Sequence, residues 1–175
     1  MIACARSINS SCLVDFIELA LTTGGRMNEL LYLRFSNVDL KRNILTFEAK
    51  TTKINRTRYF PINRLAGDVL ERRRVFKDLH CPESPWMLCN NSGKRYESPR
   101  TSFNKVLKMV GIEGFRIHDL RHRFASWLVS EGGELVKMRD LLAHSSIKMT
   151  GRYAHLAPER LHKAIRVLDS FLLIL

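Results

Sequence analysis

Apolar residues recur at helical spacing along most of this 175-residue chain, and one pair of short extended segments interrupts the pattern. In the last third, the apolar side chains repeat every three or four positions: Leu120, Phe124, Trp127, Leu128, Leu135, Met138, Leu141 and Leu142. This period predicts two successive amphipathic helices. Residues 44–47 and 58–62 are instead typical of two strands joined by a polar loop. The sequence therefore predicts an α+β fold, mainly helical, with a small antiparallel β-sheet or hairpin near the N-terminal third.

The same spacing predicts further helices over residues 13–21, 27–31, 65–79, 99–110 and 161–172. Gly24 and Gly25 separate the first two, because paired glycines favour a helix C-cap and a turn. Residues 1–12 are weakly patterned and predict a ragged linker. Residues 13–175 then form a single domain, and a domain of this length is large enough to bury a core.

The charge balance favours a polyanionic partner. Lysine and arginine number 29 against 17 acidic residues, which gives a formal net charge of +12. Such an excess fits nucleic acid best, although an anionic membrane surface or a ribosomal neighbour also fits it. No apolar run reaches the roughly 20 residues that a bilayer-spanning helix needs, and the N-terminus lacks the order of regions typical of a signal peptide.

The four cysteines predict an intracellular protein. Cys4, Cys12, Cys81 and Cys89 form no CxxC pair and show no spacing typical of a structural zinc site. Without a secretory signal, reduced thiols are the expected state. We therefore expect a cytoplasmic protein, associated with the nucleoid when it is bound to DNA.

A strongly basic loop joins the two predicted strands and carries Lys50, Lys53, Arg56 and Arg58. A basic hairpin beside a helical body is suited to reach into a DNA groove or toward a reacting phosphate. An ordinary solvated loop accounts for the same residues equally well. Earlier in the chain, Arg26 follows the glycine pair at a helix start. A solvated arginine accounts for this position when it is taken alone, but the helix macrodipole disfavours a cation there, which favours a functional role.

A second polar set lies within residues 118–155: His118, Arg121, His122, His144, Tyr153 and His155. His118 and Arg121 share a helix face because they are spaced i, i+3. Cations, imidazoles and a phenol in one place suit the handling of a phosphate. The i, i+4 pair His118 and His122 also fits a zinc site with His144 as a third ligand. Zinc, however, explains neither Arg26 nor Tyr153, and Asp119 stands where that motif needs a glutamate.

Taken in order, these segments resemble the catalytic domain of tyrosine recombinases, the phage-integrase family. The matching pieces are Thr23-Gly24-Gly25-Arg26-Met27-Asn28-Glu29-Leu30, the basic hairpin, His118-Asp119-Leu120-Arg121-His122, Leu142-Ala143-His144, and Tyr153. Each piece alone is weak evidence, but the ordered set covers roughly residues 13–160 and is highly specific. Two positions depart from the family pattern: Gly25 stands where a larger apolar residue is common, and Ala143 replaces a usual glycine.

The resemblance implies a role for each matching residue. Arg26 and Arg121 would clamp the phosphate, with Glu29 in support, and His144 would donate a hydrogen bond to it. Tyr153 would be the nucleophile and His118 its general base. Lys53 would be the general acid that protonates the leaving group, with Lys50 as the alternative because hairpin length varies. Lys50, Arg56, Arg58 and His122 are expected to contact DNA.

The resemblance also implies site-specific DNA recombination, by cleavage and rejoining through a covalent 3′-phosphotyrosine. No metal, ATP or other cofactor is expected. The implied partners are double-stranded DNA recombination sites, further copies of the chain in a tetramer on DNA, and accessory directionality or DNA-bending proteins; no membrane partner is implied. Two other activities remain open: a catalytically idle DNA-binding remnant, and relaxation of DNA like that of a type IB topoisomerase. The family also has a separate N-terminal core-binding domain, which we expect to be missing from this chain.

Overall fold

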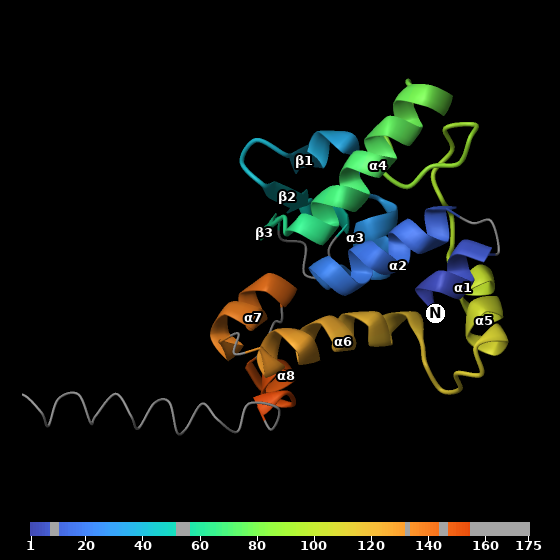
Figure 1. Cartoon of the computed structure of the whole chain (residues 1–175). Coiled ribbons are helices and arrows are strands. Elements are labelled where there is room, and N and C mark those ends of the chain that lie inside the picture. The colour runs from blue at the N-terminus through green and yellow to red at the C-terminus, as the bar shows by residue number, and fades with distance from the viewer. Residues whose placement is uncertain (8–10, 52–56, 132–133, 144–146, 155–175) are drawn as a thin grey trace, which may run out of the picture. The chain divides into compact units, whose positions relative to one another are not determined.

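The computed structural model describes residues 1–7, 11–51, 57–131, 134–143 and 147–154 (Figure 1). Its helices are α1 Ile2–Ser7, α2 Ser11–Thr23, α3 Met27–Leu31, α4 Arg64–His80, α5 Arg100–Met109, α6 Ile117–Ser130, α7 Leu135–Leu142 and α8 Ile147–Gly151. The strands are β1 Val38–Asp39, β2 Ile44–Phe47 and β3 Arg58–Pro61, with 3-10 turns η1 Phe35–Asn37 and η2 Ala49–Thr51. The predicted α+β fold with a small antiparallel sheet is confirmed. Two compact units are present, Met1–Phe124 and the part that begins at Ala125.

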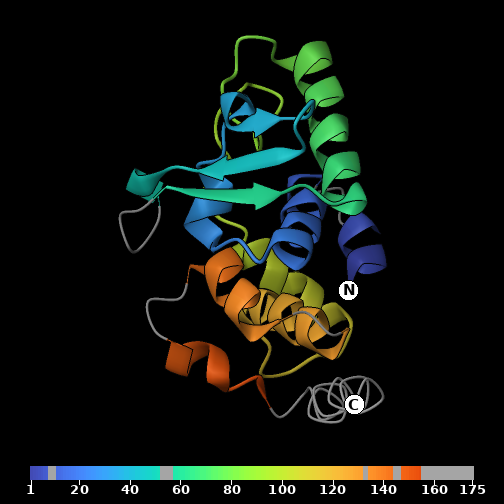
Figure 2. The same ribbon diagram turned by 90° about the vertical axis from the view of Figure 1, so that its left-hand side faces the viewer.

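The sheet of the first unit is antiparallel, in the order β1-β2-β3 (Figure 2). The two predicted strands pair as a hairpin, with Leu45 opposite Phe60 and Phe47 opposite Arg58. Strand β1 adds a short antiparallel pairing to β2. The turn between them contains Asn43, whose φ of 54° lies in the left-handed region that asparagine tolerates.

Alternation along the hairpin places one row of side chains in the interior. Leu45 and Phe47 of β2 are buried, and so are Arg58 and Phe60 of β3. Tyr59 points to the other face and is 70% exposed. This period of two is the geometry of a sheet with one face packed on the core. It carries Arg58 into the interior together with the apolar residues.

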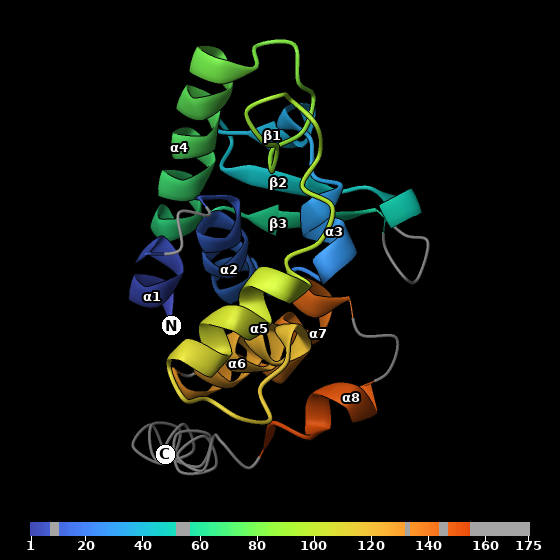
Figure 3. The same cartoon turned by 90° about the vertical axis from the view of Figure 1, so that its right-hand side faces the viewer.

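Helices pack beside this sheet in the first unit (Figure 3). Helix α2 buries Leu13, Phe16 and Ile17 completely, as its sequence period predicts, and it packs against α4. Residues 2–7 differ from the expected ragged linker, because they form α1, which packs against α2 and α5. Ala5 is fully buried there, so this segment contributes to the core.

A buried ion cluster crosses from α2 to α4. Asp15 is 2% exposed and accepts hydrogen bonds from both Arg72 and Arg73. Arg73 is also buried, and it donates to the carbonyl oxygens of Met87 at 3.0 Å and Cys89 at 2.5 Å. The Arg73 guanidinium therefore satisfies backbone carbonyls inside the protein.

Helix α7 and the short α8 belong to the second unit. Met138 and Leu142 are buried on α7, as the apolar period predicts. Trp127, which was expected in the apolar stripe of α6, is 50% exposed. The predicted last helix, residues 161–172, lies outside the described residues. Among the helices that are described, none has the length and apolar character needed to cross a membrane.

Candidate active site

The turn after α2 is built around Thr23 and two glycines. Gly24 has a φ of 60°, a left-handed conformation that glycine adopts without steric cost. The Thr23 hydroxyl donates to the Leu19 carbonyl oxygen at 2.6 Å and accepts from the Gly25 N–H at 3.1 Å. The chain therefore reverses sharply and places Arg26 at the N-cap of α3.

Gly25, where the family commonly has a larger apolar residue, has no room for a side chain. A Cβ built there would lie 2.8 Å from Leu30 Cδ2 and 2.9 Å from Leu30 Cγ, far closer than normal contact. Leu30 is fully buried and fills this space. Leu30 therefore occupies the space that a larger side chain at position 25 would need.

Glu29 holds Arg26 in place. Its carboxylate accepts from the Arg26 backbone N–H at 2.8 Å and from Arg26 Nη1 at 3.0 Å. The Glu29 side chain is fully buried, whereas the Arg26 side chain keeps 19% of its surface exposed. An acid in the first helical turn also offsets the macrodipole cost of the arginine beside it. The pair thus fixes the backbone and one guanidinium nitrogen of Arg26, while part of the side chain stays exposed.

Helix α6 supplies the second arginine and a histidine. Asp119 accepts from the Arg116 backbone N–H at 2.8 Å and pairs with the Arg116 side chain, which fixes the start of the helix. Two residues further, the buried Arg121 donates from Nη1 to the Gly24 carbonyl oxygen at 2.7 Å. This bond ties the α6 arginine to the glycine turn that carries Arg26.

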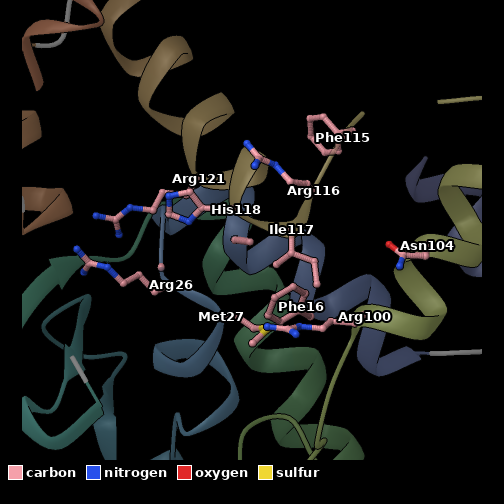
Figure 4. A pocket seen from close by; sticks show the side chains of 12 residues that line it. Phe16, Arg26, Met27, Arg100, Asn104, Phe115, Arg116, Ile117, His118 and Arg121 are labelled. Carbon is pink, nitrogen blue, oxygen red and sulfur yellow. The ribbon is translucent and has the colours of Figure 1, made fainter. Parts of the chain in front are cut away.

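Arg26, His118 and Arg121 line one pocket of about 440 Å³ within the first unit (Figure 4). In the close-up the two guanidinium groups extend in the same direction, with the His118 ring next to Arg121. Arg100 and Arg116 also line the pocket, so its charged walls are all cationic. Such a wall suits a phosphate, because guanidinium groups bind its oxygens through paired N–H donors.

The environment of His118 favours its neutral form. Partial burial lowers the pKa of His118, and the nearby His122 and Arg121 lower that pKa further. Its ring lies edge-on to the His122 ring, with 4.8 Å between centroids. An imidazole with a lowered pKa is unprotonated at neutral pH and so can accept a proton.

Arg58 was predicted to contact DNA, but the structure places its side chain in the interior. Its side chain is 5% exposed, and its Nη2 atom is 2.6 Å from Glu29 Oε2. The guanidinium carbon also lies 4.4 Å from the centre of the Phe47 ring. A buried, ion-paired guanidinium does not match the surface contact we expected. Strand alternation puts Arg58 on the same face as Phe60, but the sequence does not say which face is buried, because the adjacent Tyr59 is aromatic as well.

The other predicted site residues are placed as follows. Lys50 is exposed on η2 and pairs with Glu48 at 2.7 Å. Lys53, Arg56 and His144 lie outside the described residues. Within the parts of the chain that are described, no group of three or more His, Cys, Asp or Glu side chains is arranged to bind a metal ion.

Tyr153 belongs to the second unit and follows α8. It is 6% exposed, and its backbone N–H donates to the Thr150 carbonyl oxygen at 3.1 Å. In the same unit, Ala143 ends α7 with a φ of 48°. This is the left-handed C-terminal position that glycine normally takes, which accounts for the glycine usual in the family.

The model of the phage integrase family matches residues 1–160. The chain belongs to this family. Curated relatives include the integrase of Salmonella phage P22, 32% identical over 166 residues, and tyrosine recombinase XerD of Rhizobium meliloti, 33% identical over 156 residues. These matches cover 90% and 86% of this chain but 43% and 49% of the relatives, so the integrase-family chain spans about half their length.

Solved structures of the family have the same fold. The catalytic domain of bacteriophage HP1 integrase is 29% identical and aligns with a TM-score of 0.65, over 92% of this chain and 90% of that domain. XerA recombinase aligns with a TM-score of 0.74 at 22% identity, over 93% of this chain and 59% of its own. The mainly helical fold with a three-stranded sheet is therefore the fold of an integrase catalytic domain.

Proposed function

We propose that this chain is the catalytic part of a site-specific DNA recombinase that cuts and rejoins double-stranded DNA through a covalent 3′-phosphotyrosine. The observation that carries the proposal is the pocket in which Arg26 and Arg121 stand beside a histidine of lowered pKa. Membership of the phage integrase family supports the same chemistry. So does the net charge of +12, which favours a polyanionic substrate.

The two arginines would stabilise the reacting phosphate. A phosphodiester already carries negative charge, and attack on phosphorus concentrates more of it on the non-bridging oxygens. Preorganised donors directed at such charge each contribute about 3–4 kcal/mol to the transition state. Because Arg26 and Arg121 carry permanent charge, this stabilisation needs no metal ion.

Tyr153 would act as the nucleophile. A free tyrosine phenol has a pKa of about 10, so attack by a tyrosine at neutral pH needs a base. His118 would take the proton as the tyrosine oxygen bonds to phosphorus and the bond to the 5′-oxygen breaks. Lys53, or Lys50 in its place, would protonate that 5′-oxygen. His144 would donate a hydrogen bond to the phosphate.

Rejoining would reverse the same steps. A 5′-hydroxyl from the partner duplex attacks the phosphotyrosine, the tyrosine leaves with a proton, and a new phosphodiester forms. The bond energy is conserved in the covalent intermediate, so no ATP is consumed.

The expected partners follow from this reaction. Exchange between two duplexes needs four cleavages, so we propose a tetramer of this chain's parent protein on paired DNA sites, in the cytoplasm and associated with the nucleoid. Accessory proteins that bend DNA or set direction would act on the same complex. Solved relatives include the XerH recombinase bound to its difH substrate. Lys50, Arg56 and His122 would contact the DNA.

The test is a pool of nicked duplexes with randomised sequence around the nick, incubated with the chain at low salt. When cleavage falls just beside the nick, a short fragment diffuses away and the covalent protein–DNA adduct is trapped. We expect adducts from the wild-type chain and none from Tyr153→Phe. A wild-type chain that binds DNA but forms no adduct would instead support an idle DNA-binding module.

A topoisomerase-like activity would give a different result. It requires cleavage and rejoining within a single duplex, so it relaxes supercoiled plasmid without joining two DNA molecules. We expect exchange between two duplexes that carry the trapped sequence. Relaxation without exchange, abolished by Tyr153→Phe, would contradict recombination while it supports the phosphotyrosine chemistry.

A further inference from the structure

Glu29 receives two arginines from different parts of the first unit. Its Oε1 atom accepts from Arg26 Nη1 at 3.0 Å, and its Oε2 atom accepts from Arg58 Nη2 at 2.6 Å. The Glu29 side chain is fully buried and that of Arg58 is 5% exposed. A buried carboxylate keeps its charge and its orientation through such partners. The position of Glu29 therefore depends on Arg58 as well as on Arg26.

Arg58 itself is fixed by the sheet. It is the first residue of β3, pairs in register with Phe47, and lies with its guanidinium against the Phe47 ring. The residue before it, Thr57, accepts a hydrogen bond from the Ala49 N–H at 3.2 Å. The base of the basic loop is thus closed immediately before the arginine that reaches Glu29.

The two guanidinium groups that bind Glu29 differ in their surroundings. Arg58 is buried, whereas Arg26 lines the pocket with part of its side chain exposed. Arg26 is therefore the one of the two that a phosphate in the pocket can reach.

We propose that Arg58 is a positioning residue, which acts through Glu29 to hold the Arg26 guanidinium in the orientation that a phosphate in the pocket requires. The connection also couples the end of the basic loop to the first arginine of the clamp. This inference deepens the proposed function and rests on it. It assigns Arg58 no contact with DNA.

The first test compares Arg58→Met with Arg73→Met. Arg73 is a matched control because it too is a buried arginine paired with a carboxylate, but it binds Asp15 and lies outside the pocket. Adduct formation on trapped DNA is followed in single turnover at saturating DNA, per folded molecule. Misplacement of a catalytic group by about 1 Å costs about 100-fold in rate. We expect a loss of that order for Arg58→Met and no loss for Arg73→Met.

DNA binding separates a positioning role from a surface contact. A lysine or arginine that contacts a phosphate reduces the slope of log binding constant against log salt by about one when it is removed. We expect Arg58→Met to leave the dissociation constant and this slope unchanged. A weaker affinity with a smaller slope would overturn the proposal and restore Arg58 as a DNA contact.

Two further variants test the route through Glu29. Arg58→Lys keeps the charge but loses the planar fork, so it should fold and recover part of the rate. In a cycle with Glu29→Gln, the double variant should lose no more rate than the worse single variant, because both changes break one connection. Independent, multiplicative losses would overturn the proposal.

A readout without chemistry distinguishes failure of this inference from failure of the proposed function. The NMR signal of Arg26 Nε–H should report an ordered side chain in the wild type and an averaged one in Arg58→Lys. If the wild-type chain forms no adduct, the proposed function fails while this signal still tests the positioning role. If Arg26 is equally ordered in both chains, the positioning role is contradicted whatever the activity.

Discussion

Two buried carboxylates in the first unit each hold a pair of arginines, and their surroundings differ. Asp15 binds Arg72 and Arg73 between α2 and α4, and Glu29 binds two arginines from α3's N-cap and β3. Both carboxylates are at most 2% exposed. Each cluster therefore contains a buried carboxylate with two arginines, and this pairing alone does not separate a structural cluster from a candidate catalytic one.

The difference lies in what else the arginines reach. Arg73 also donates to two backbone carbonyl oxygens, and Nη2 of the half-exposed Arg72 also donates to Glu18 at 2.6 Å. Around the other carboxylate, Arg58 is buried but Arg26 opens onto the pocket that it shares with Arg121. We therefore infer a catalytic role for the cluster whose arginine lines a pocket, and a structural role for the other. The following predictions test that distinction, from the largest expected effect to the smallest.

The largest effect should come from Arg26→Ala. Loss of one preorganised donor costs about 3–4 kcal/mol of transition-state stabilisation, so trapped adducts should disappear from an ordinary assay. Arg72→Ala removes the corresponding half-exposed arginine of the Asp15 cluster and should leave adduct formation per folded molecule unchanged. Denaturing gel electrophoresis of the trapped adducts measures both. Survival of adducts in Arg26→Ala would show that the distinction is wrong.

The free energy of unfolding should depend more on the Asp15 cluster than on the Glu29 cluster. Arg73→Met leaves Asp15 with Arg72 alone and removes the guanidinium donor from the carbonyl oxygens of Met87 and Cys89. Breaking a buried pair costs about 3–5 kcal/mol. Urea unfolding should show a loss of that order. Arg26→Met should cost less, because its side chain is partly exposed. A larger loss for Arg26→Met than for Arg73→Met would reverse the assignment of the two clusters.

Two glycines give a matched pair of smaller effects. A Cβ at Gly25 would overlap Leu30 beside the Glu29 cluster, and overpacking of this kind costs about 1–3 kcal/mol. At Gly67, within α4, an added Cβ would meet Ile62 at an ordinary 3.7 Å. Gly67→Ala should therefore stabilise the helix by about 0.5–1 kcal/mol. Thermal unfolding of both variants checks the signs, and stabilisation by Gly25→Ala would contradict the close packing at the turn.

The smallest effects should be opposite pH dependences of stability. Burial raises the pKa of Asp15 above its ordinary value, so its contribution is present below about pH 3.9 and is lost as the pH rises through the folded value. Burial lowers the pKa of His118, so its contribution is present above about pH 6.5 and is lost as the pH falls through the folded value.

These two signs are measurable by urea unfolding across pH. Relative to Asp15→Asn, the wild type should lose stability as the pH rises from about 4. Relative to His118→Asn, it should lose stability as the pH falls below about 6.5. The same sign for both differences would contradict the environments described for these groups.

In His122→Asn, removal of a neighbouring charge should raise the pKa of His118 and move the acid limb of adduct formation to higher pH.

Local patterns predicted the hairpin, the glycine turn and the helix face shared by His118 and Arg121, because each of these features depends on a few neighbouring residues. The family resemblance then connected Arg26 to Arg121, and the structure places both in one pocket. The partners of the buried arginines were missed because they are tertiary: Arg58 meets Glu29 from 29 positions away, and Arg73 meets Asp15 from 58.

A second class of difference has a local cause. In Arg58-Tyr59-Phe60 two aromatic residues follow one another, so the period of two does not say which face is buried. The helical period likewise placed Trp127 in the apolar stripe of α6, but the structure leaves its side chain half exposed. In both cases the buried face is decided by the packing of other elements, which a local period does not contain.

The most direct test of the proposed chemistry is to identify the residue that carries the DNA. Trapped adducts are digested with nuclease and protease, and the peptide that retains a 3′-linked nucleotide is found by mass spectrometry. The chain has four tyrosines, Tyr32, Tyr59, Tyr96 and Tyr153, so the result is discriminating. We predict a phosphodiester link at Tyr153 alone. A nucleotide on any other residue, or adducts that persist in Tyr153→Phe, would contradict it.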